Sequence, residues 1–151
     1  QDVAEVVKWM KVLNRDAADL AVEFGLRGGT DVTGFSLLGH AMEMANFSGV
    51  CLRFRMKNMP FVSCARKYAR AWTFPGGASD NRLFFGGRVT FSASIPEEEQ
   101  MLLFDPQTSG GLLLALPAAS RDEFLRRAQA NDQPVWVVGE VLEGSGVEVV
   151  E

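Results

Sequence analysis

The spacing of apolar residues changes repeatedly along this chain of 151 residues, and this constrains the fold more than any other feature. From residue 3 to 24 apolar side chains recur every three or four positions, which predicts one amphipathic helix. Residues 50–56 alternate, with Arg53 and Arg55 on the polar side, which predicts a half-buried strand. Residues 112–116 form an apolar run of buried-strand length. The chain must therefore combine a sheet with covering helices.

The other segments repeat both patterns without a strict strand–helix–strand order. Further helices are expected at 34–45, at 61–71, after Pro96 and at 120–130, and further strands at 88–94, 135–142 and 147–150. Residues 73–87 are interpreted as an irregular connection with room for a short helix, and Glu143–Gly146 as the turn of a hairpin. We therefore predict a single α+β domain over residues 1–151, with a mixed β-sheet flanked by helices.

Composition and charge exclude several classes of protein. With 47% hydrophobic and 23% charged residues, the chain can form a core and is not disordered. Its net charge of -4, with no stripe of Lys and Arg, does not fit a nucleic-acid-binding protein. No apolar run approaches the roughly 18 residues that cross a bilayer, so no membrane partner is expected.

The two cysteines, Cys51 and Cys64, form neither a disulfide framework nor a zinc motif. We interpret them as buried structural thiols, and this usage favours the reducing cytoplasm. The chain begins at Gln1, without Met, inside an apparent helix. We therefore expect that this chain is part of a larger protein, with further residues before Gln1.

Thr30-Asp31-Val32-Thr33-Gly34 places a carboxylate and two hydroxyls before a helix. Such a site can hold phosphate on free N–H groups, and Asp31 is a suitable oxygen ligand for Mg²⁺. Spacing alone favours the simpler interpretation that Asp31 or Thr33 caps the helix, because such caps are common.

A second polar cluster, Asp105–Gly111 (DPQTSGG), leads into the apolar run at residue 112. The N–H groups of this loop could form an anion nest, with Thr108 and Ser109 adding hydroxyl donors. The residues alone favour a tight turn, in which Asp105 and Pro106 start the bend and the glycines relieve strain.

Two further observations argue against a catalytic histidine and against complete nucleotide binding by this chain. His40 is the only histidine and lies on a largely apolar helix, which is typical of a hydrogen-bonded structural residue. Neither glycine-rich segment fits a mononucleotide or dinucleotide fingerprint, so we do not expect complete nucleotide binding.

The two clusters together carry a family resemblance. TDVTGFSLLGH at 30–40 followed by DPQTSGGLLLALP at 105–117 resembles the C-terminal domain of selenophosphate synthetase (selenide, water dikinase), in the aminoimidazole ribonucleotide synthetase-like superfamily. Leu13-Asn14 with Ala17-Ala18, and PGGASDN at 75–81, agree with it. Ser36 stands where the family commonly has Gly.

The resemblance implies a two-domain homodimeric enzyme that converts ATP, selenide and water into selenophosphate, AMP and phosphate with Mg²⁺, for selenocysteine and selenouridine synthesis. Most of the ATP site, further metal-binding aspartates and a catalytic Cys or selenocysteine with a nearby Lys would lie in an N-terminal domain absent from this chain, which alone should be inactive. Asp31 would complete the Mg²⁺ coordination. A phosphate-binding or domain-interface role is implied for Thr30, Thr33, Gly34, Thr108, Ser109, Gly110 and Gly111.

Two alternatives stay open at this point. One is the C-terminal domain of a related ATP-dependent synthase or kinase of the same superfamily, whose substrate differs. The other is a non-catalytic interaction domain.

Overall fold

Six strands form two separate sheets in a computed structural model that describes residues 1–151. An antiparallel ribbon pairs β1 (Gly28–Asp31) with β4 (Leu112–Ala115). The second sheet contains, in spatial order, β3 (Val89–Phe91), β6 (Gly146–Val150), β2 (Cys51–Arg55) and β5 (Gly139–Leu142). In this sheet β6 runs parallel to both of its neighbours, whereas β5 runs antiparallel to β2. The sheet is therefore mixed, as predicted.

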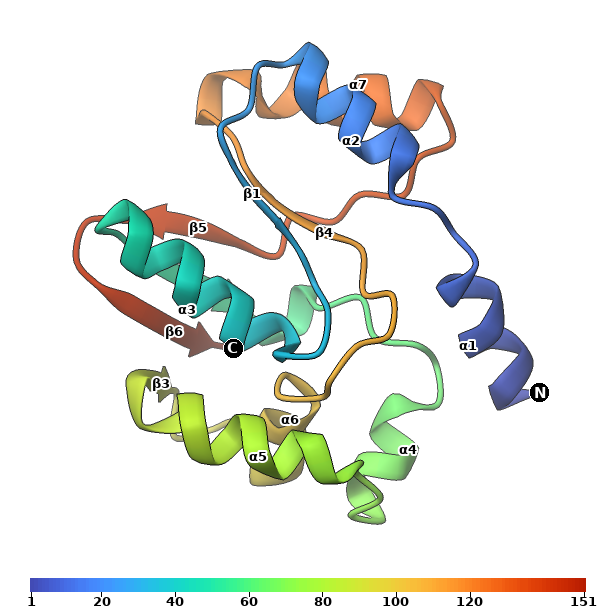
Figure 1. The fold of residues 1–151 in the computed structure, drawn as a ribbon, viewed down its shortest axis with the longest axis vertical. Helices are drawn as coiled ribbons and strands as arrows, with labels where there is room; N and C mark the ends of the chain where they lie inside the picture. The colour runs from blue at the N-terminus through green and yellow to red at the C-terminus, as the bar shows by residue number, and fades with distance from the viewer.

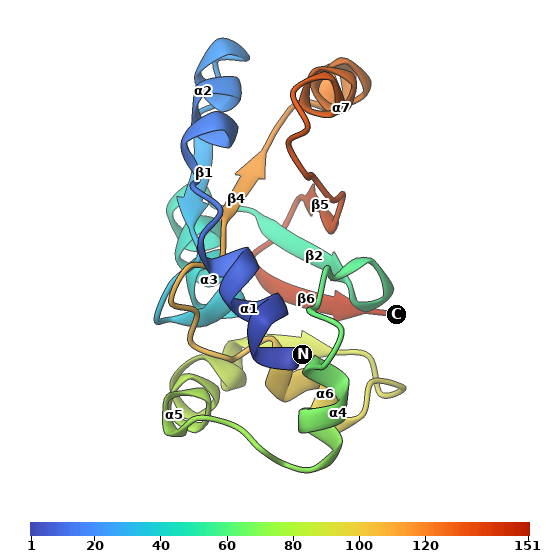
Figure 2. The same cartoon turned by 90° about the vertical axis from the view of Figure 1, so that its right-hand side faces the viewer.

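Helices lie at both ends of the molecule and, in the case of α3 (Ser36–Ser48), against the four-stranded sheet (Figure 1). In chain order the helices are α1 (Asp2–Met10), α2 (Arg15–Glu23), α3, α4 (Ala65–Arg70), α5 (Gly76–Phe85), α6 (Glu97–Leu102) and α7 (Arg121–Ala130), with short 3₁₀ turns at 56–58, 86–88 and 118–120. α2 and α7 lie together at one end of the β1–β4 ribbon, and α5 and α6 lie beyond its other end (Figures 1 and 2). None of the helices combines the length and the apolar character of a membrane span.

The main core lies between α3 and the four-stranded sheet. It contains 14 buried residues, among them Leu38, Leu52 and Phe104. Arg53 and Arg55 point to the other face of β2, where they pair with glutamates of β6 and β5. This is the alternation that the sequence predicts, because successive side chains of a strand face opposite sides.

A much smaller core lies between α2 and α7. Its fully buried members are Leu20, Phe124 and Ala128. Leu114 and Leu116, from β4 and the residues after it, pack against this cluster. The β1–β4 ribbon therefore joins two apolar clusters of very different size.

The single helix expected at residues 3–24 is wrong, because the segment forms α1 and α2 with a break at Lys11–Asn14. The two helices pack on different partners. In α1, Asp2 accepts a hydrogen bond from Lys67 at 2.8 Å, whereas α2 buries Leu20 against α7. Periodicity cannot reveal the break, because both helices carry apolar residues at the same spacing.

The hairpin expected around Glu143–Gly146 is also wrong. β5 and β6 do run in opposite directions, but β2 lies between them and pairs with both. A central strand gains hydrogen bonds on both edges, and β2 is the strand whose Leu52 and Phe54 enter the main core.

Two further elements differ from expectation. Gly28–Asp31 forms strand β1, although its two glycines and Asp31 have low strand propensity. The ten-residue helix α5 fills most of the segment interpreted as irregular, and α4 is shorter than expected. Both cysteines are buried and free, as predicted, and burial with the nearby Glu148 raises the pKa of the Cys51 thiol.

Candidate functional site

The β1–β4 ribbon brings the two polar clusters together. Asp31 pairs with Leu112, the first residue after the DPQTSGG loop. The pairing continues beyond the strands, because Val32 N–H donates to the Gly111 carbonyl at 2.9 Å and Gly110 N–H donates to the Val32 carbonyl at 3.0 Å. Two segments far apart in sequence therefore form one surface.

Gly110 and Gly111 permit this close approach for different reasons. A Cβ on Gly110 would lie 2.7 Å from the Val32 carbonyl oxygen, closer than real Cβ contacts allow. Gly111 has φ +85°, a left-handed conformation that favours glycine. The paired glycines thus hold one motif against the other. The N–H group of Gly110 donates to the Val32 carbonyl, so it is not free to bind an anion.

The PGGASDN segment supports the same surface. In α5, the buried Asn81 donates through Nδ2 to the carbonyl oxygens of Gly34 and Phe104, both at 3.0 Å. It therefore ties the segment after Asp31 to the residue before Asp105. Sequence reasoning noted this segment in the family resemblance but assigned no role to Asn81, because a buried amide at helical spacing does not reveal its distant partners.

Asp31 ends β1 with its side chain at the surface. Its carboxylate makes no hydrogen bond or ion pair within the chain, and it does not cap α3. No group of three or more His, Cys, Asp or Glu side chains is placed to hold a metal ion. Mg²⁺ is held by one or two carboxylates with phosphate oxygens and water, and a single exposed, unpaired carboxylate such as Asp31 is chemically compatible with that role.

The start of α3 differs from the expected cap by Asp31 or Thr33. Neither side chain caps the helix; instead the Thr33 carbonyl accepts from Ser36 N–H at 2.9 Å, and Ser36 Oγ accepts from Gly39 N–H at 3.3 Å. Ser36 is fully buried and has φ +69°. A left-handed conformation favours glycine, so it is compatible with the Gly that the family resemblance led us to expect at this position.

The remaining predicted residues surround this junction. Thr30 is half-buried, and its hydroxyl donates to the Asp31 carbonyl at 3.0 Å. Gly34 and Thr108 are exposed and Ser109 is half-buried, so the hydroxyls of the second loop lie at the surface. The structure therefore brings all the predicted residues to one region.

The base of the second loop carries a perturbed carboxyl group. Burial raises the pKa of Asp105, and a hydrogen bond from Gln107 Nε2 at 2.5 Å partly opposes that rise. Gln107 N–H also donates to the Thr33 carbonyl at 3.0 Å. Gln107 therefore couples Asp105 to the first motif.

Thr33 is bonded to the only histidine. Thr33 Oγ1 lies 2.9 Å from His40 Nε2, and His40 Nδ1 lies 3.4 Å from a Glu43 carboxylate oxygen. His40 is therefore a buried, hydrogen-bonded residue, as the sequence indicates, but its partner is a site residue.

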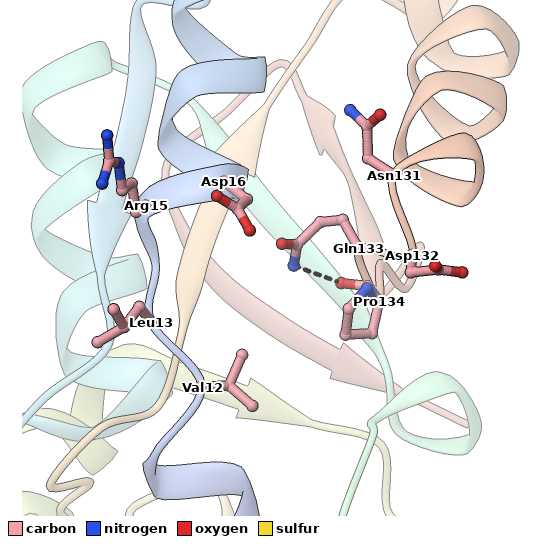
Figure 3. Close-up of a pocket in the computed structure, with 8 residues that line it drawn as sticks. All are labelled: Val12, Leu13, Arg15, Asp16, Asn131, Asp132, Gln133 and Pro134. Atoms are coloured by element: carbon pink, nitrogen blue, oxygen red, sulfur yellow. Dashed lines mark hydrogen bonds between the residues drawn. The ribbon is translucent and has the colours of Figure 1, made fainter.

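A surface hollow lies elsewhere, between the α1–α2 connection and the C-terminal end of α7 (Figure 3). It has a volume of ≈ 570 Å³, and no residue of the 30–40 or 105–117 segments lines it. Leu13, Arg15 and Asp132 are among the side chains around it. Its position away from both motifs separates it from the candidate site.

The fold and the paired motifs define a class of protein. Residues 2–151 match the family described as AIR synthase related protein, C-terminal domain, and the chain belongs to this family. This confirms the superfamily that the motifs indicated.

Among curated relatives, the chain is similar to proteins that share one name. The chain is 40% identical over 139 residues to selenide, water dikinase of Caldanaerobacter subterraneus subsp. tengcongensis, covering 91% of this chain and 40% of that protein. It is 38% identical over 149 residues to selenide, water dikinase of Pseudomonas aeruginosa, covering 99% of this chain and 42% of that protein. The chain therefore spans about two fifths of the length of these relatives.

Solved structures share the fold at lower identity. Thiamine-monophosphate kinase from Stenotrophomonas maltophilia K279a superposes with a TM-score of 0.58 at 18% identity, over 85% of this chain and 32% of that one. The protein tt0281 from Thermus thermophilus gives 0.56 at 19% identity, over 86% and 33%. These similarities confirm the α+β fold.

Proposed function

We propose that this chain is the C-terminal domain of a selenide, water dikinase, which forms selenophosphate, AMP and phosphate from ATP, selenide and water. The observation that supports this most directly is the junction of the two motifs, where the free Asp31 carboxylate stands at the surface. Relatives with this name cover nearly the whole chain at 36–40% identity.

Asp31 would contribute one oxygen ligand to Mg²⁺ bound to ATP on the N-terminal domain. Bound Mg²⁺ neutralises charge on the phosphates, and phosphoryl transfer depends largely on such positioning and neutralisation. Thr108 and Ser109 would face the phosphates or the other domain, since their hydroxyls are at the surface beside Asp31's strand. We further propose a cytoplasmic homodimer for the full-length enzyme.

The decisive experiment replaces Asp31 by Asn in the full-length protein. We expect a loss of about 100-fold in selenide-dependent AMP formation, because an amide is a weaker Mg²⁺ ligand than a carboxylate, and changes even to the outer-shell partners of a metal typically cost roughly 10–100-fold. Asp132→Asn is the matched control: Asp132 is also exposed, lies by α7, and has φ +51°, which Asn tolerates. Near-normal activity of Asp31→Asn would remove Asp31 from the site.

The substrate is tested separately in the full-length protein. AMP formation from ATP should require selenide, and other nucleophiles should not replace it. Turnover that is independent of selenide would instead indicate a related ATP-dependent enzyme of the same family.

The isolated domain offers a further test. Because the junction supplies a single carboxylate and no complete metal cluster, residues 1–151 alone should bind Mg²⁺–ATP weakly or not at all. Titration calorimetry that gave micromolar affinity for this chain would contradict the division of the site between two domains.

A further inference from the structure

The His40 ring lies between the side chains of Thr33, a residue of the candidate site, and Glu43. His40 lies in α3, and its ring is about nine-tenths buried. Its Nε2 faces Thr33 Oγ1 at 2.9 Å and its Nδ1 faces a carboxylate oxygen of Glu43 at 3.4 Å. The Phe35 ring, 5.7 Å away between centroids, covers one side of the imidazole. The ring is thus held between two specific partners.

The carboxylate of Glu43 favours one direction of the hydrogen bond between Thr33 and His40. An ionised carboxylate only accepts, so in the neutral imidazole the proton is favoured on Nδ1, which faces Glu43. Nε2 is then an acceptor, and Thr33 donates its single hydroxyl proton to it. The Thr33 oxygen keeps its lone pairs but has no proton left to give.

The alternation of burial along this segment indicates that Thr33 lies on the same side of the chain as Asp31. Asp31 is exposed, Val32 is buried and Thr33 is half-exposed, as expected for an extended segment whose side chains alternate. Phosphate oxygens require a donor, whereas a cation requires lone pairs. A Thr33 hydroxyl bonded to His40 therefore suits a cation and not a phosphate.

We propose that His40 is a positioning residue that orients the Thr33 hydroxyl, and that Thr33 is a second oxygen ligand for Mg²⁺ beside Asp31. This inference rests on the proposed function and assigns Thr33 to the cation rather than to phosphate. Neutral hydroxyl oxygens hold Mg²⁺ in P-loop enzymes, so the chemistry is appropriate.

The test measures metal binding directly in the full-length protein. Mn²⁺ is a paramagnetic substitute for Mg²⁺, and its binding is titrated by electron paramagnetic resonance in the presence of a non-hydrolysable ATP analogue. In a separate titration with EDTA present, the binding of the metal-free analogue to the protein is measured. Thr33→Val keeps the side-chain shape and removes the hydroxyl, so it should weaken Mn²⁺ binding roughly 10-fold without changing metal-free analogue binding. Thr33→Ser should remain close to the wild type.

The His40 variants separate positioning from packing. His40→Phe fills the ring space without an acceptor, and should weaken Mn²⁺ binding several-fold. His40→Gln offers an amide oxygen near the position of Nε2, and should restore most of the affinity. Equal effects of Phe and Gln would overturn the role of His40. If neither variant folds, as judged by circular dichroism, the Thr33 pair decides whether the hydroxyl is a ligand.

The outcomes distinguish this inference from the proposed function. Unchanged Mn²⁺ affinity in Asp31→Asn would refute the proposed metal role of Asp31. Weakened affinity in Asp31→Asn with unchanged affinity in Thr33→Val would refute only the present inference. Weaker metal-free analogue binding in Thr33→Val would make Thr33 a phosphate donor, and would also refute it.

Discussion

The two ends of the β1–β4 ribbon differ in what holds them. At one end, Asp31 and Leu112 adjoin α3 and the main core of 14 buried residues. At the other, Gly28 and Ala115 lead to α2 and α7, whose core has three fully buried residues. The candidate site lies at the strongly packed end, where Asn81 and the loop glycines also fix the backbone.

Because of this difference in packing, we expect the end with the candidate site to be more stable against local unfolding than the α2–α7 end. Local opening costs least where few apolar side chains are buried. We therefore expect the α2–α7 end to open without disturbing the junction of the two motifs, whereas damage to the main core should unfold both ends.

Phe104→Ala should have the largest effect. Phe104 is completely buried in the main core, and removing such a ring costs about 3–5 kcal/mol in free energy of unfolding. Urea denaturation measures the loss, and hydrogen exchange should show α2 and α3 losing protection together. Loss of protection only near residue 104 would contradict the expectation that damage to the main core unfolds both ends of the ribbon.

Phe124→Ala should destabilise the protein less and more locally. Phe124 fills the small core and meets Phe24 edge-to-face with centroids 5.1 Å apart. We expect a loss of about 2–3 kcal/mol, below that of a main-core ring because fewer neighbours are left around the cavity. Hydrogen exchange should accelerate in α2 and α7 and stay slow in α3. Equal acceleration in α3 would mean that the two cores unfold as one.

Gly110→Ala tests the contact that joins the two motifs. The added methyl group would meet the Val32 carbonyl oxygen, so we expect about 1–3 kcal/mol of destabilisation from overpacking. Gly34→Ala is the matched control, because a Cβ there meets nothing within 4 Å. Thermal unfolding compares the two, and equal effects would show that the ribbon end tolerates displacement.

Ser36 provides a smaller test of the same end. Ser36→Ala removes the hydroxyl that accepts from Gly39 N–H but keeps the strained φ, and should cost about 1 kcal/mol. Ser36→Gly also loses the hydroxyl but relieves the strain, so it should be more stable than the Ala variant. Denaturant midpoints order the three proteins, and an Ala variant above the Gly variant would contradict the strain.

The smallest effect is expected for Asp105→Asn. Burial raises the pKa of Asp105 in the folded protein, so ionisation of this group opposes folding once the pH exceeds its ordinary value of 3.8. The amide keeps an oxygen that can accept from Gln107. The variant should therefore unfold at a slightly higher temperature at pH 7, with the gain shrinking as the pH falls towards 4. A gain independent of pH would exclude ionisation as its cause.

Local patterns predicted the elements of the main core but not their partners. The alternation at residues 50–56 located β2 and the faces of Arg53 and Arg55 correctly. The hairpin failed because β2 competes for both β5 and β6, and such long-range pairing leaves no local trace. β1 was missed because its pairing with β4, rather than its own residues, makes it a strand.

The candidate site was predicted as two separate clusters. Their order in the sequence pointed to one family, which the comparisons confirm. Three contacts were not predictable, because each depends on the folded backbone: that of Gly110 with Val32, the two hydrogen bonds that Asn81 donates to Gly34 and Phe104, and the pairing of His40 with Thr33. The proposed metal role of Asp31 remains a prediction.

The position of β6 has a consequence for biosynthesis. Its residues 146–150 lie between β2 at 51–55 and β3 at 89–91, and no other strand joins those two. During translation, the edges of β2 and β3 that pair with β6 therefore stay unpaired until nearly a hundred residues after Cys51 have been synthesised. A nascent chain that stalls before Gly146 would expose these unpaired edges to other chains, which favours aggregation.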